Sequence, residues 1–290
     1  MTAFKKIIQH HRDWLVKSES RIPIEFNYLK EDLSDGTLSA LDNVSDSLGR
    51  LATYFGIKGI LAVNDDVQSG WEDISKSLNY RYWALKIRAK SFSKTAFLGG
   101  IKAIPNLTNQ IGNAGCLLAA FVAMDRDDLA APVADVLLGM LTIKGAVNSD
   151  HLRLRNFEPF MIWLYSVYSG ENVNSEIVFS DLGVYQRVID SWDKSDELSF
   201  ALDSLCEYHV SNATDAGGRR DPEFKNPPFD LLPLEINAIS VVRKKLGLEM
   251  PYVNHPLLSL KTSSADQIFI NSDDLSDEVE IAYNRLFGGR

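Results

Sequence analysis

The side chains that could take part in catalysis are few and widely spaced along the chain. The five histidines are His10, His11, His151, His209 and His255, and no two have the three- or four-residue spacing that brings imidazoles onto one helical face as metal ligands. Cys206 and His209 lie at helical spacing and could in principle form a nucleophile and its base. No third group orients the histidine, so we expect Cys206, like Cys116, to be a buried thiol of an apolar helix.

The sequence lacks the motifs of common enzymes. It has no G-x-x-x-x-G-K-[ST] phosphate loop, no H-E-x-x-H, no paired C-x-x-C and no G-x-S-x-G elbow. Gly112-Asn-Ala-Gly115 follows no strand pattern, so it predicts close helix packing rather than dinucleotide binding. We therefore predict no catalytic residue, no metal site and no cofactor, with an unrecognised hydrolase as an open alternative.

Carboxylates are the reactive side chains that do cluster. One cluster holds Asp65, Asp66, Glu72 and Asp73, and a second holds Asp273, Asp274, Asp277 and Glu278. Metal-assisted hydrolysis would need such groups to converge in a cleft, whereas these positions fit helix caps and outward helical faces. From residue 265 to the end of the chain, six acids face only two arginines. Both clusters are therefore predicted to be partner-binding surfaces that attract a basic protein.

The composition narrows the class of partner. The formal net charge is −9 and the pI is near 5.1, so the long-range field repels nucleic acid and anionic membrane surfaces. The longest apolar runs fall far short of the roughly 20 residues that span a bilayer. The first residues lack the apolar stretch of a signal peptide, and both cysteines fit a reducing compartment. We expect a cytoplasmic protein that binds neither nucleic acid nor membrane.

The elements that would position these residues are helical. Apolar residues repeat at three- and four-residue steps and predict helices near 4–15, 38–55, 71–89, 108–124, 131–143, 150–168, 182–192, 195–210, 230–246 and 274–287. Asn64-Asp65-Asp66 offers an N-cap for the third helix. We predict an all-α fold, an array of about ten antiparallel helices without a substantial sheet. One domain covers 1–290, with an elbow at 91–107, where Gly99, Gly100 and Pro105 oppose helix continuation.

Two stretches carry a family resemblance. Residues 108–129 read TNQIGNAGCLLAAFVAMDRDDL, a helix of small residues that leads into an apolar helix and a short charged turn. Residues 229–258 read FDLLPLEINAISVVRKKLGLEMPYVNHPLL, a helix with a Gly-Leu stop and an extended segment. Together they resemble the all-helical immunity family forty-nine of bacterial polymorphic-toxin systems. The resemblance implies an antitoxin that binds a cognate protein toxin and blocks it by occlusion, and it supplies no catalytic residue.

Three functions follow as expectations. The first is an immunity protein, whose acidic surfaces would best suit a basic toxin. The second is a helical adaptor or scaffold that binds a peptide or protein in a groove. The third is a hydrolase that reverses a toxin's modification. The oligomeric state and the chemistry of the toxin are left open by the residues.

Overall fold

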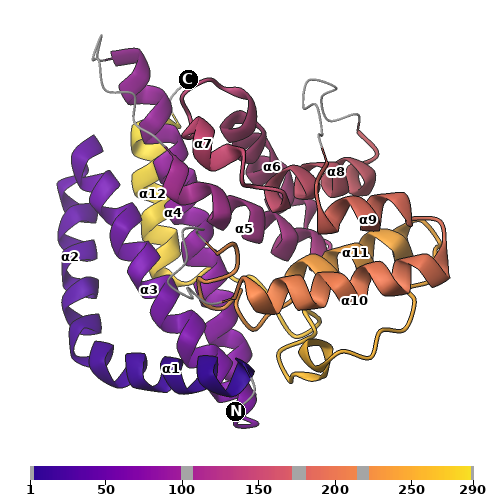
Figure 1. Cartoon of the computed structure of the whole chain (residues 1–290). Coiled ribbons are helices and arrows are strands. Elements are labelled where there is room, and N and C mark those ends of the chain that lie inside the picture. Colours follow the sequence, from indigo (N-terminus) through magenta and orange to yellow (C-terminus); the bar gives the residue numbers. More distant parts are fainter. Residues whose placement is uncertain (1–2, 99–106, 172–180, 214–221, 289–290) are drawn as a thin grey trace. The chain divides into compact units, whose positions relative to one another are not determined.

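The computed structural model describes residues 3–98, 107–171, 181–213 and 222–288 (Figure 1). The fold is all-α, as the sequence predicts, and the described residues contain an isolated bridge between Lys144 and Val147 but no strand. The chain divides into two compact units. Unit 1 comprises Met1–Leu107 and Ile268–Arg290, and unit 2 comprises Thr108–Gln267. The predicted single domain over 1–290 stays a prediction.

Unit 1 is built on two long helices. Its helices are α1 (Ala3–Ser18), α2 (Ile22–Asp35), α3 (Leu38–Asn64), α4 (Gly70–Leu98) and α12 (Asp274–Phe287). Thr37 caps α3 by accepting a hydrogen bond from the amide of Ala40 at 3.2 Å. α3 and α4 pack along their length, and their facing apolar residues form the core of the unit.

The C-terminal helix α12 completes unit 1. Figure 1 shows α12, in yellow, beside α3 and α4, and α12 contacts both of them. Val279, Ala282 and Tyr283 are the apolar side chains that α12 buries. The ring of Tyr283 packs edge-on against Trp83 of α4, with centroids 5.8 Å apart. Segments from the two ends of the sequence therefore share one core.

Unit 2 is centred on the apolar helix α5. Its helices are α5 (Ile111–Ala123), α6 (Asp127–Thr142), α7 (Ser149–Leu152), α8 (Phe157–Ser169), α9 (Val184–Asp190), α10 (Ser195–Ser211) and α11 (Leu234–Lys245). α5 packs against α6, α8 and α11. All but two residues of α5 are buried. The two stretches that carry the family resemblance, which contain α5 and α11, thus contact each other inside one unit.

Gly112 and Gly115 allow α5 to approach its neighbours closely. A Cβ at Gly115 would lie 2.9 Å from Cγ of Glu158 and 3.0 Å from the ring of Phe157. A Cβ at Gly112 would lie 3.0 Å from the guanidinium of Arg155. Side chains there would displace these groups, so the prediction of close helix packing is confirmed.

Several helix boundaries differ from the predictions. α2 was not predicted, although Ile22, Phe26, Leu29 and Leu33 follow the helical period and a proline occupies its first turn. The helix predicted over 150–168 is two helices, α7 and α8. The N-cap prediction for Asn64-Asp65-Asp66 is wrong, because α3 continues to Asn64, Asp65 and Asp66 follow its end, and α4 begins only at Gly70. Of the predicted elbow, residues 91–98 belong to α4, and 99–106 lie outside the described residues.

Candidate functional site

The first predicted acidic cluster lies where α3 turns into α4. Asp65 accepts a hydrogen bond from the guanidinium of Arg12 on α1 at 2.9 Å, and Asp73 pairs with Lys58 of α3 at 3.0 Å. Glu72 lies in the first turn of α4 with its side chain exposed, and Asp66 is exposed in the turn. Asp65 and Asp73 thus stabilise the helix arrangement, whereas Glu72 faces solvent.

The second cluster begins α12. Asp273 is the N-cap and accepts hydrogen bonds from the amide of Ser276 at 2.9 Å, the hydroxyl of Tyr80 at 2.8 Å and the ammonium of Lys76 at 3.1 Å. Partial burial disfavours the charged form of Asp273, but the hydrogen bonds from Ser276, Tyr80 and Lys76 outweigh it and lower its pKa. Burial and the neighbouring Asp273 raise the pKa of Tyr80 above its usual range. Asp273 is therefore ionised at neutral pH and fixes α12 to α4.

Lys76 connects the two clusters along α4. Asp73 and Lys76 lie three residues apart on α4, so they share one face of that helix, and Lys76 reaches Asp273 of the second cluster. Beyond this ion-paired row, Asp274, Asp277 and Glu278 are exposed on α12. We call the eight predicted carboxylates together the acidic end. Its inner members are paired with Arg12, Lys58 and Lys76, and its outer members face solvent.

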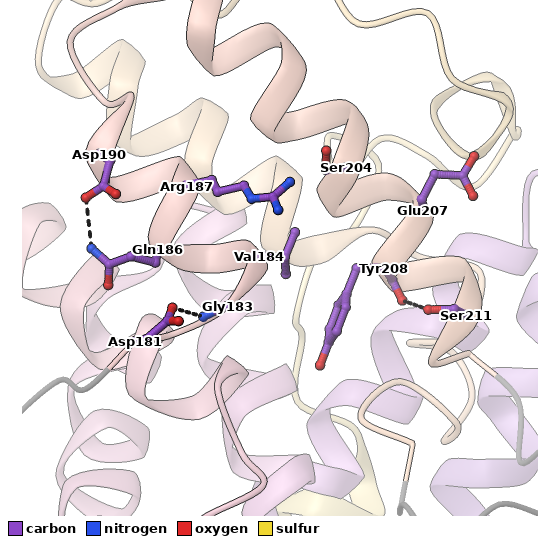
Figure 2. Close-up of a pocket in the computed structure, with 10 residues that line it drawn as sticks. All are labelled: Asp181, Gly183, Val184, Gln186, Arg187, Asp190, Ser204, Glu207, Tyr208 and Ser211. Carbon is purple, nitrogen blue, oxygen red and sulfur yellow. Dashed lines mark hydrogen bonds between the residues drawn. The ribbon is translucent and has the colours of Figure 1, made fainter.

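A groove in unit 2 was not predicted from the sequence. It lies between α9 and α10, has a volume of about 880 Å³, and is shown in Figure 2. α9 and the residues before it contribute Asp181, Gly183, Val184, Gln186, Arg187 and Asp190, and α10 contributes Ser204, Glu207, Tyr208 and Ser211. In Figure 2, Arg187 extends from α9 into the space between the two helices. Carboxylates outnumber this cation along the groove.

Tyr208 connects the groove with a buried polar cluster. Its side chain forms a hydrogen bond with Glu223, which is almost completely buried. Burial and the nearby charge of Glu158 raise the pKa of Glu223 to about 7, although Arg155 and Tyr208 oppose this shift. Nε of Arg155 donates to both carboxylate oxygens of Glu158 at 3.0 Å. This cluster therefore contains the Arg155–Glu158 ion pair and a carboxyl group, that of Glu223, whose pKa lies near neutrality.

A second buried pair joins α10 to α11. Nδ1 of His209 lies 2.6 Å from Oε1 of Glu235, and the ring of Phe224 stacks on the imidazole with centroids 4.3 Å apart. Cys206, one turn earlier, is a free and buried thiol, as predicted for it and for Cys116. Burial, together with the charge of Glu235, raises the pKa of Cys206 to about 12. The thiol is consequently protonated at neutral pH and is a poor nucleophile.

Glu158, Glu223 and Glu235 were missed by the sequence predictions. For Glu158 and Glu235 the available signal was an acid inside an apolar run, as in Phe157-Glu158-Pro-Phe160 and Leu234-Glu235-Ile236. Such an acid is buried only when it is paired or neutralised, so it predicts a partner elsewhere in the chain. The sequence does not identify that partner.

Comparisons with known proteins add nothing on the function of this chain, because it matches no protein family, no curated protein and no solved structure. Among the described residues, no three histidine, cysteine or carboxylate side chains are grouped so that they could hold a metal ion. In the same part of the chain, no helix has both the length and the apolar character needed to cross a bilayer.

Proposed function

We propose that this chain is an immunity protein that binds a basic protein toxin through the acidic end of unit 1 and occludes it. The observation that supports this function best is that Lys76 connects the two predicted acidic clusters, whose outer carboxylates are exposed. The proposal also rests on the resemblance of residues 108–129 and 229–258 to a helical immunity family.

The division between inner and outer carboxylates suits this role. The inner pairs connect α1, α3, α4 and α12, and a surface that is already formed before binding lowers the entropic cost of association. The outer acids on α12 stay exposed and can steer a cationic partner during association. Ile281 follows Asp274 and Glu278 on the same face of α12, and its side chain is exposed. It offers an apolar contact beside the charges.

The proposal is tested by neutralising the outer acids. The triple variant D274N/D277N/E278Q is co-expressed with the toxin candidate encoded beside this chain, and cell survival and the Kd of the complex are measured. We expect weaker protection of the cells and at least tenfold weaker binding of the toxin. The association rate should also depend less on salt, because exposed charges act mainly by attracting the partner during association.

The matched control removes the same number of charges from unit 2. D135N/D150N/E249Q changes three exposed carboxylates outside the acidic end. Its binding and protection should equal those of the unmodified chain. Equal losses in both triple variants, or full protection by D274N/D277N/E278Q, would argue against the acidic end as the binding surface.

A further inference from the structure

α10 exposes a continuous row of side chains along the groove of unit 2. Asp196, Phe200, Ser204, Glu207 and Ser211 follow steps of four, four, three and four residues, so they lie on one face of the helix. The last three line the groove between α9 and α10. Phe200 extends the same row toward the start of α10, and 77% of its surface is exposed.

A second exposed aromatic side chain lies beside this row. The hydroxyl of Ser199, next to Phe200, donates to the backbone carbonyl of Tyr252 at 3.1 Å. Tyr252 is 83% exposed. Nε2 of His255 lies 3.0 Å from Oε1 of Glu207, which fixes the segment 252–255 along α10. The backbone at Tyr252 is thus bound to α10 beside Phe200, and the side chains of both residues are exposed.

In the part of the chain that the structure describes, carboxylates are the commoner charges near the two aromatic side chains. Asp196, Asp203 and Glu207 are exposed on α10, and Asp190 lies across the groove on α9. Arg187 is the cation among the residues that line the groove, and it forms no ion pair with another described residue. The surface therefore combines exposed aromatic rings with an excess of carboxylates.

We propose that this face of unit 2, formed by α10, the groove and Tyr252, binds a basic amphipathic helix of a partner protein. The rings of Phe200 and Tyr252 can take an apolar anchor or the face of a guanidinium, and the carboxylates can pair with cations on either side. The row on α10 has the helical period, which a partner helix with anchors three, four and seven residues apart can match. This site uses none of the residues of the acidic end and does not depend on the identity of any toxin.

A designed peptide tests the proposal on the full chain. The probe is a fluorescein-labelled helical peptide of about 18 residues, with arginine and leucine at the matching spacing, and its Kd is measured by fluorescence anisotropy at low and at physiological ionic strength. We expect F200A/Y252A and D196N/D203N/E207Q each to weaken binding at least tenfold. Replacing the arginines of the probe by citrulline, which keeps their shape without the charge, should weaken binding to a similar extent.

The acidic-end variant D274N/D277N/E278Q provides the control, because it has the same charge change as D196N/D203N/E207Q. It should bind the probe within twofold of the unmodified chain. Loss of binding in this variant alone would place the peptide on unit 1 and overturn the proposal. Absence of binding to the arginine probe would also overturn it, as would a homodimer that F200A/Y252A abolishes, since the occupant would then be a second copy of this chain.

Discussion

At the scale of single residues, the interior of unit 2 is notable for the ionisable groups that it buries. Arg155 and Glu158 are almost completely inaccessible, and their mutual hydrogen bonds offset the loss of water. Burial alone would lower the pKa of Arg155, but Glu158 raises it above its usual range. Among the described residues, the cation near Glu223 is Arg155, which already pairs with Glu158, and burial raises the pKa of Glu223 to about 7.

The raised pKa of Glu223 predicts how the stability of the protein depends on pH. The folded protein binds the Glu223 proton more tightly than the unfolded chain, whose carboxyl has a pKa near 4.5. Its contribution to stability is therefore complete below that value and is lost as the pH rises through about 7. Thermal unfolding followed by circular dichroism should show the Tm falling by a few degrees between acidic and mildly alkaline pH. The variant E223Q, which cannot ionise there, should show a smaller fall.

E249Q serves as the comparison, because Glu249 is an exposed acid of the same unit. It should keep the pH dependence of the unmodified chain. If the Tm of E223Q and that of E249Q fall by the same amount as the pH rises, the titration of Glu223 does not contribute to the pH dependence of stability.

At the scale of the elements, the packing of α3 on α4 depends on two glycines. A Cβ at Gly59 would lie 2.7 Å from the backbone carbonyl oxygen of Gly70, and one at Gly70 would lie 2.7 Å from the carbonyl of Gly59. A backbone atom cannot move aside as a side chain can, so the two helices approach this closely only because both positions lack a side chain.

Alanine at Gly59 is therefore expected to destabilise the protein, although alanine is the better helix former. We expect G59A to lower the free energy of unfolding by about 1–3 kcal/mol through overpacking. Gly49 lies in the same helix, and a Cβ there would have no neighbouring atom within 4 Å. G49A should therefore raise the free energy of unfolding by about 0.5–1 kcal/mol. Urea denaturation measures the free energy of unfolding of both variants. A stabilising G59A would show that α3 and α4 can separate without cost.

At the scale of the whole molecule, the two units differ in how the chain forms them. Unit 2 is one continuous segment, whereas unit 1 joins the first 107 residues to the last helix. α12 buries Val279, Ala282 and Tyr283, so the N-terminal segment of unit 1 has an exposed apolar face without it. Each unit has buried residues of its own, including Leu48, Ile74 and Tyr80 in unit 1 and Phe121, Phe157 and Ile239 in unit 2.

The continuous segment is therefore expected to fold by itself. A fragment of residues 108–267 should show a helical circular dichroism spectrum and one cooperative thermal transition. A fragment of residues 1–107 should unfold at a lower temperature than the fragment 108–267, or it should aggregate. Adding a peptide of residues 268–290 should stabilise it. A non-cooperative 108–267 fragment would mean that unit 2 requires the rest of the chain.

The sequence by itself determined the all-α class and most helix positions, because helical periodicity is local: the predicted 274–287 matches α12, and the predicted 195–210 differs from α10 by one residue. It also predicted the buried state of both cysteines, which the structure confirms. Only the tertiary structure decided that Lys76 joins the two acidic clusters, that Glu223 is buried beside Glu158, and that the backbone at Tyr252 is bound to α10 beside Phe200. These are contacts between residues far apart in the chain, and no local pattern specifies which helix faces meet. The acidic end and the face of α10 are consequently the two surfaces at which experiments on binding should begin.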